Sequence, residues 1–206
     1  FIDLLQNREY SLHDRLVNVL SATAEIQYAL DEEDTEEIKA IAQELSHPEI
    51  IAERVESLKK ALPEKPLENA ENMLLYLERL DFIGDILPQQ IKDASRFVKK
   101  LSAPLKAQTS GEYEKLAVYF VYRYFLKAVR DFDLLSKIKA MIVFVFAAEV
   151  INLSREQDAH ARFETVKELC KEIEYSGDNM DRIYDDSYLS DIFSDTSMLA
   201  LLEWTL

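Results

Sequence analysis

The chain has 206 residues, with 39 acidic side chains against 24 basic ones and a formal net charge of −15 at pH 7. This charge gives no general attraction to nucleic-acid phosphates or anionic lipid, so we expect no nucleic acid and no membrane as a partner. Only three Gly and five Pro are present, which leaves little turn chemistry for β-hairpins and no glycine-rich phosphate loop. The composition therefore predicts an all-α fold. A single Cys fits a reducing compartment, and we expect the cytoplasm.

Capping residues mark the first helices. Ser11 and Asp14 match the capping-box pattern and predict the start of a long amphipathic helix. Thr35 is the expected N-cap of the next helix, because Glu36 and Glu37 then place negative charge at the positive end of the helix dipole.

Proline and glycine divide the middle of the chain. Pro48 suits the first turn of a further helix, and the stretch 63–66, which holds two prolines, is the expected linker. Helices are predicted over 67–82 and 91–101, with a break over 84–88 between them.

The stretch 138–153 is the longest apolar segment. As a helix it spans about 24 Å, which is shorter than the roughly 30 Å of a bilayer core, and it contains charged residues. We therefore expect it to be the central buried helix of an irregular multi-helix bundle. The aromatic segment 113–130 should be another mostly buried helix, which follows a loop over 102–111 and is opened by a capping box of Thr109 and Glu112.

The sequence after residue 153 predicts shorter helices. Ser154 and Gln157 form a capping pattern, and Gly177 is the expected C′ glycine at the end of the helix that follows. The apolar stripe of that helix consists of Phe163, Val166, Cys170 and Ile173.

Few residues suggest catalysis by a familiar motif. Cys170 lies on an apolar stripe, so we interpret it as a core residue rather than a nucleophile. His13, His47 and His160 are far apart in the sequence, and we interpret each as a surface residue. No metal site is predicted in this chain.

Two features have a structural and a functional interpretation. Tyr119, Tyr122 and Phe125 are spaced for one helix face; they form either core packing, which is the commoner outcome, or an aromatic cage for a methylammonium or sulfonium cation. Over 172–206, nine acidic residues stand against one basic residue. They form either a solvated face or a surface that attracts a lysine-bearing partner.

Three stretches together resemble the bacterial flagellin lysine-N-methylase family. Residues 2–16 are similar to its "lLQ-R-sLe-RL" segment, residues 115–125 with 133–139 to its "NYLvYRfF…D-dLysKvK" segment, and residues 171–179 to its "sReiEHSdeN" segment. Tyr175 stands where the family motif has His, and Ala117-Val118 replace the expected Asn.

The resemblance implies a protein-lysine N-methyltransferase that acts on flagellin with S-adenosylmethionine as methyl donor. The N-terminal part of the family carries a cysteine-rich motif associated with an iron–sulfur or other metal cluster. Because Cys170 is the single cysteine here, we expect this chain to be the helical C-terminal portion, with no cofactor bound by this segment. Whether residues are missing before Phe1 or within 102–111 is left open.

The last motif contains the residues most suited to a substrate ammonium group. On a regular helix Glu172, Ser176 and Asn179 share one face. They either orient a lysine or bond Arg123 to fix two helices together. Glu172 and Glu174 are the candidates to help deprotonate a lysine nucleophile.

Two functions therefore remain open. The first is a substrate-binding or supporting part of a lysine methyltransferase, with Tyr119, Tyr122, Arg123, Glu172, Glu174, Ser176 and Asn179 as its candidate residues. The second is a non-catalytic helical adaptor that binds a basic protein through its acidic tail. We expect a single helical domain over 1–206, with a possible division into 1–62 and 67–206; the oligomeric state is left open.

Overall fold

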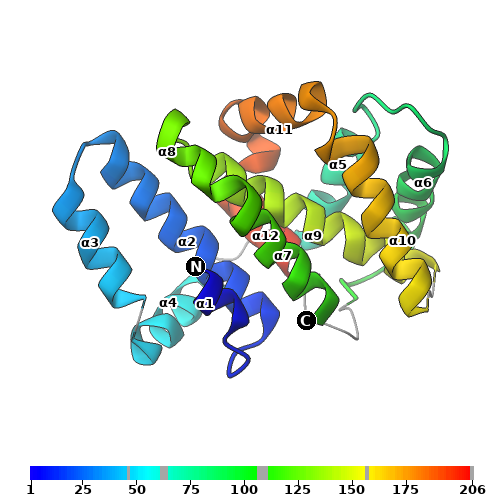
Figure 1. Cartoon of the computed structure of the whole chain (residues 1–206). Coiled ribbons are helices and arrows are strands. Elements are labelled where there is room, and N and C mark those ends of the chain that lie inside the picture. Colours follow the sequence, from blue (N-terminus) through cyan, green and yellow to red (C-terminus); the bar gives the residue numbers. More distant parts are fainter. Residues whose placement is uncertain (46, 61–64, 106–110, 156–157, 205–206) are drawn as a thin grey trace.

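The computed structural model describes residues 1–45, 47–60, 65–105, 111–155 and 158–204. Within these ranges the regular structure is helical and no strand occurs (Figure 1). The predicted all-α class is confirmed.

The helices follow one another with short connections. The first half holds α1 (Ile2–Gln6), α2 (Leu12–Asp31), α3 (Thr35–Glu44), α4 (Pro48–Lys60), α5 (Pro66–Leu77) and α6 (Ile86–Val98). The second half holds α7 (Gly111–Tyr124), the 3₁₀ turn η1 (Phe125–Lys127), α8 (Ala128–Asp131), α9 (Leu135–Arg155), α10 (Ala159–Leu169), the π-helical turn η2 (Cys170–Glu174), α11 (Gly177–Leu189), η3 (Asp191–Phe193) and α12 (Asp195–Leu202).

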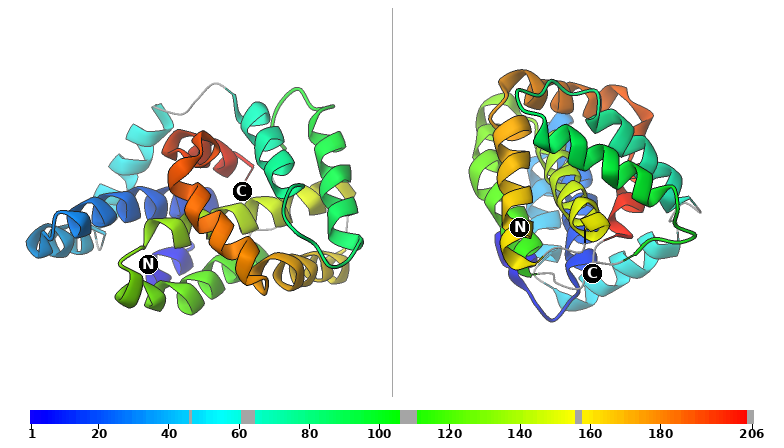
Figure 2. Two further views of the ribbon diagram at one scale, coloured as in Figure 1. Left: turned by 90° about the horizontal axis from the view of Figure 1, so that it is seen from above. Right: turned by 90° about the vertical axis from the view of Figure 1, so that its right-hand side faces the viewer.

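Helix α9 is the centre of the fold, as predicted from its apolar sequence. Every residue over 136–152 is buried, on all faces of the helix. Helices α2, α6, α7, α10, α11 and α12 pack against it, and the right-hand view of Figure 2 shows it enclosed by other helices. No helix in the described part of the chain is long and apolar enough to span a membrane.

Two lysines lie within the buried first turns of α9. The Lys137 ammonium is 2.9 Å from Asp133 and 3.1 Å from Asp131. The Lys139 ammonium donates to the Ser187 carbonyl at 3.2 Å and lies 3.4 Å from Asp195. Because a buried charge is tolerated only when it is paired, these acidic partners allow α9 to begin inside the protein.

Helix α3 folds back from the C-terminal end of α2, and α4 follows it toward α1 (Figure 1), so that both contact α2. A small apolar cluster of Ala22, Ile26 and Ile41 joins α2 to α3, apart from the main core. The division of the chain at 62–67 stays a prediction, because residues 61–64 lie outside the described ranges.

The predicted start of α2 is confirmed, whereas the predicted N-cap of α3 is wrong by one residue. The Ser11 hydroxyl accepts from the Asp14 amide at 3.1 Å. In α3, Asp34 is the N-cap, and its carboxylate accepts from the amides of Glu36 and Glu37. A carboxylate caps at least as well as a hydroxyl, so Asp34 takes the position expected for Thr35.

Two further boundaries differ from the prediction. Pro88 lies inside the first turn of α6 rather than in a break, because a helix leaves its first amides without intrahelical partners and so tolerates proline there. Asp158 caps α10 by accepting from Ala161, while Ser154 donates to the Ile151 carbonyl. Thr109, Gln157 and half of the 102–111 loop lie outside the described residues.

The stripe predicted for α10 holds only at its C-terminal end. Ile173 is buried and Cys170 half-buried, but Phe163 is 65 % exposed. Within the regular helix Ala159–Leu169 the buried residues are Thr165 and Leu169, so Phe163 lies off the buried face before the π-helical turn η2 begins at Cys170. Gly177 does not end the helix; it is the first residue of α11, behind the N-cap Ser176.

His13 is buried rather than on the surface. Its Nδ1 donates to the Leu202 carbonyl at 2.7 Å, which ties the start of α2 to the end of α12. His47 and His160 are exposed, as expected.

The central position of α9 gives a test of the core. We expect Phe144→Ala to lower the free energy of unfolding by about 3–5 kcal/mol, because it leaves a cavity in a fully buried region. The matched variant Phe163→Ala, on the exposed side of α10, should change it by less than about 1 kcal/mol. Urea unfolding followed by circular dichroism measures both; equal losses would contradict this packing.

Candidate functional site

Glu174 is the centre of a cluster that joins α7 to the π-helical turn. Its carboxylate is fully buried. Glu174 Oε1 accepts from the hydroxyls of Tyr119 and Tyr124, each at 2.6 Å, and lies 2.9 Å from Arg123 Nε. Three donors from one helix therefore converge on one oxygen of the turn that follows α10.

Three tyrosine rings surround the guanidinium of Arg123. The ring centroids of Tyr119, Tyr124 and Tyr175 lie 5.8, 5.5 and 5.4 Å from its Cζ atom. These are cation–π distances, so the cluster binds a cation that belongs to the chain itself.

Tyr119, Tyr122 and Phe125 do not form the aromatic cage, which was the less common of the two interpretations. Tyr119 turns its hydroxyl to Glu174, Tyr122 points to the exterior, and Phe125 packs edge-on against Phe1 at 5.1 Å. The 3₁₀ turn that begins at Phe125 interrupts the regular helix on which the spacing argument depended.

The electrostatics of the cluster favour a structural role over proton transfer. Burial and the hydrogen bond to Glu174 raise the pKa of both Tyr119 and Tyr124 well above the ordinary value. Burial and Glu174 also raise the pKa of the Cys170 thiol. These groups stay protonated near neutral pH, so neither tyrosine supplies a base and Cys170 supplies no thiolate.

Glu172 holds the loop between α5 and α6. Its Oε2 accepts from the amides of Ile83, at 2.8 Å, and Gly84, at 3.1 Å, and Lys171 lies 3.0 Å from its Oε1. The Gly84 amide and Lys171 hold the pKa of Glu172 below its usual value. A Cβ at Gly84 would lie 2.9 Å from Glu172 Oε1, so the loop approaches this carboxylate closely because residue 84 is glycine.

Asn179 fixes the same loop from α11. Its Oδ1 accepts from the Asp81 amide at 3.0 Å, and its Nδ2 donates to the carbonyls of Asp81, at 2.7 Å, and Glu172, at 3.0 Å. Ser176 is the N-cap of α11 and accepts from the Asn179 amide.

The predicted face of Glu172, Ser176 and Asn179 is therefore not one helix face. The chain turns at Tyr175 and Ser176 between two helical segments, and Asn179 reaches Glu172 across that turn. Arg123 pairs with Glu174 and not with Glu172. The expected link between two helices exists, but a different carboxylate makes it.

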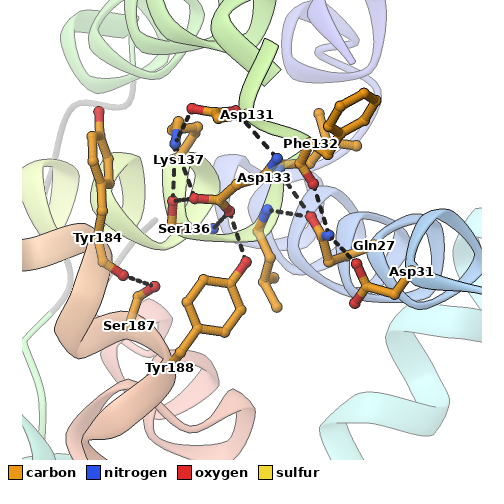
Figure 3. Close-up of polar contacts among 12 residues, drawn as sticks. Gln27, Asp31, Asp131, Phe132, Asp133, Ser136, Lys137, Tyr184, Ser187 and Tyr188 are labelled. Atoms are coloured by element: carbon orange, nitrogen blue, oxygen red, sulfur yellow. Dashed lines mark hydrogen bonds and ion pairs between the residues drawn. The ribbon is translucent and has the colours of Figure 1, made fainter. Parts of the chain in front are cut away.

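A second polar network lies where α8 meets α9, and the sequence argument missed it (Figure 3). Gln27 Nε2 donates to the Phe132 carbonyl, and its Oε1 accepts from the amides of Leu134 and Leu135. Asp133 accepts from Ser136, Lys137 and, at 2.7 Å, the Tyr188 hydroxyl.

The charge of Asp133 is stabilised in this network. Burial opposes ionisation, but the hydrogen bonds from Ser136, Tyr188 and Lys137 prevail and lower the pKa of Asp133. Asp133 and Lys137 lie within one of the segments that carry the resemblance. The sequence contains one signal that could have predicted this network: the Asp-x-x-Ser spacing of Asp133 and Ser136 before the central helix, which is typical of a helix N-terminus.

The residues present do not fit a cysteine-ligated metal cluster. Such clusters are held by several thiolates, whereas this sequence has one Cys, whose thiol is held in its protonated form. In the described ranges, no group of three or more His, Cys, Asp or Glu side chains is placed to hold a metal ion.

Removing the central carboxylate tests the α7 cluster. We expect Glu174→Ala to lower the free energy of unfolding by about 2–4 kcal/mol, because it leaves buried donors without their acceptor. Glu164→Ala, on the exposed side of α10, is the matched control and should have little effect. Urea unfolding measures both, and a loss at Glu174 no larger than at Glu164 would contradict the cluster.

The lowered pKa of Glu172 predicts a pH-dependent stability contribution. A depressed carboxyl pKa stabilises the fold above the unfolded-state pKa, and this contribution disappears as the pH falls through the folded-state value. We expect Glu172→Gln to destabilise the chain at neutral pH, and we expect the two urea-unfolding curves to converge as the pH falls below the ordinary glutamate pKa of 4.5 and through the lower folded-state pKa of Glu172. A difference that is constant with pH would show that packing, not charge, is lost.

Comparison with known proteins identifies the family to which this chain belongs. Residues 1–201 match the family model of the FliB lysine N-methylase C-terminal domain. No curated protein and no solved structure matches the chain. The match covers nearly the whole chain, including all three stretches that carry the resemblance and both polar networks. The chain belongs to the FliB lysine N-methylase C-terminal domain family.

Proposed function

We propose that this chain is the substrate-binding helical domain of a protein-lysine N-methyltransferase, which acts on flagellin with S-adenosylmethionine as methyl donor. The observation that carries the proposal is the family match over residues 1–201. The structure supports a binding role by the placement of its exposed carboxylates.

These carboxylates form an acidic surface on α11 and on the adjoining loop between α5 and α6. It consists of the exposed residues Asp81, Asp85, Asp178, Asp181 and Asp185. The hydrogen bonds from Asn179 to Asp81 hold the loop against the start of α11. A surface of this charge attracts a lysine-bearing protein and accelerates its association.

Binding and methyl transfer place opposite demands on a lysine. Carboxylates near an ammonium stabilise its charged form, whereas a lysine nucleophile must first lose a proton. Glu172 and Glu174 are both buried and engaged by donors of this chain. We therefore assign the acidic surface to docking of the substrate, and we assign no residue of this chain to the methyl donor or to proton removal.

The test is a kinetic separation of binding from chemistry in the whole enzyme. We expect Asp81→Asn, Asp178→Asn and Asp181→Asn together to raise KM for flagellin about three- to tenfold, with kcat little changed, because the rate of encounter falls. Transfer of labelled methyl groups from S-adenosylmethionine measures both constants. The effect should shrink at high salt, because salt screens exposed charges.

A matched triple variant controls for the loss of negative charge. Glu32→Gln, Glu37→Gln and Glu53→Gln remove the same charge from exposed positions on the α2–α4 side and should leave KM unchanged. An equal effect of both sets would contradict the acidic surface. Flagellin binding without any methyl transfer by the unsubstituted enzyme would instead support the adaptor function.

A further inference from the structure

The segment 115–130, which covers most of α7, η1 and α8, differs in charge from the rest of the chain. It contains four basic residues and no acidic one, although the chain carries a formal net charge of −15. Arg123 is paired with Glu174. Lys115, Lys127 and Arg130 are exposed and form no ion pair with any described residue. Lys127 contacts the Tyr124 ring, 4.6 Å from its centroid, and the charge of Lys115 acts on Glu112. The segment still presents three basic groups to solvent, none of them in an ion pair with a described carboxylate.

Large apolar side chains are exposed between these charges. Tyr122 lies in α7, Leu126 in the 3₁₀ turn η1, Val129 in α8 and Phe132 directly after α8, and each is 64–75 % exposed. Figure 1 shows α8 continuing in the general direction of α7, with η1 between them. We call these four residues the docking stripe. An exposed apolar row of this size on a helix is typical of a protein–protein contact.

Phe132 has a backbone conformation that residues with a Cβ rarely adopt. It lies in the left-handed region, with φ 57° and ψ 24°, at the C-terminal end of α8. Glycine or asparagine is preferred there, because a Cβ crowds the backbone. Gln27 pins the Phe132 carbonyl at 3.0 Å (Figure 3). The fold thus holds a large apolar side chain outward at a position where a smaller residue would suit it better.

The docking stripe continues into a pocket at its other end. An open pocket of about 390 Å³ lies between α1 and α7, and Ile2, Val118, Tyr119 and Tyr122 are among its lining residues. Tyr122 belongs to both features, and Lys115 also lines the pocket. The combined surface offers apolar contact along the helix with basic side chains beside it.

We infer that the docking stripe binds a protein partner through a segment whose apolar side chains are flanked by carboxylates. The basic residues beside the stripe select against a basic partner, so this surface is separate from the acidic surface and independent of the proposed function. A membrane is disfavoured, because the chain as a whole carries a net charge of −15. The partner's carboxylates complement Lys115, Lys127 and Arg130.

A pair of designed peptides tests the inference. The first is a dye-labelled amphipathic peptide of about 15 residues, with leucines at the spacing of the stripe and glutamates beside them. The second has lysine at every glutamate position. We expect fluorescence anisotropy to show that the acidic peptide binds at least about tenfold more tightly than the basic one. No binding of the acidic peptide, or equal binding of both, would overturn the inference.

Variants of the chain locate the contact. Leu126→Ala with Val129→Ala should weaken binding of the acidic peptide about tenfold, and Lys127→Glu with Arg130→Glu should reverse the preference between the two peptides. Leu189→Ala, another exposed apolar position, should leave binding unchanged. Phe132→Asn should weaken binding while the urea midpoint stays the same or rises, which separates this effect from misfolding. Binding that none of the stripe variants affects would overturn the assignment.

Two other occupants are outcomes of the same test. Sedimentation velocity shows whether a second copy of this chain covers the stripe, in which case Leu126→Glu would convert a dimer to a monomer. Flotation with phosphatidylserine-containing vesicles shows whether lipid binds it. Either result would overturn the inference of an acidic protein partner.

Discussion

The fold depends on the complete burial of one helix. Because α9 has no exposed face over 136–152, it is stable only when other helices cover it on every side. This requirement assembles α2, α6, α7, α10, α11 and α12 around it. The charged groups at its start then need partners, and those partners come from the turn before it and from α12. The burial of α9 thus determines both the composition of the core and the position of the polar networks at the start of this helix.

Buried ion pairs connect the surrounding helices to one another. Glu114 on α7 lies 2.7 Å from Arg15 on α2, and both side chains are almost fully buried. Arg8, in the connection after α1, reaches the same carboxylate at 2.9 Å. Removing one partner would leave the other charge buried in a low-dielectric interior without a counter-charge. Such pairs therefore fix the arrangement of the helices more than they add net stability. Helix α7 therefore takes part in two such contacts: Glu114, near its start, pairs with Arg15 and Arg8, and Arg123, near its end, pairs with Glu174.

The sequence predicted the central helix and the Ser11 cap, misplaced other helix ends by a few residues, and failed where distant segments meet. The length and apolar composition of the stretch 138–153 identified α9, and the Ser11 cap depends only on the next three residues. The burial of His13 depends on α12, which lies at the far end of the chain. The π-helical turn at Cys170–Glu174 rotates the side chains that follow it and so decides which carboxylate contacts Arg123. No pattern of side chains predicts such a turn. Of the candidate residues, Arg123 and Glu174 do converge, whereas Tyr122 points outward and Ser176 is a helix cap.

The arginine among the tyrosines has a consequence for selectivity. Arg123 is tethered beside its rings and its carboxylate, so it behaves as an internal competitor whose effective concentration is on the order of millimolar or higher. Any external cation must displace both a charge-assisted contact and the ring contacts before it can enter. The tyrosine cluster is therefore closed to weakly binding ammonium groups, and lysines that approach this domain meet a site that is already filled.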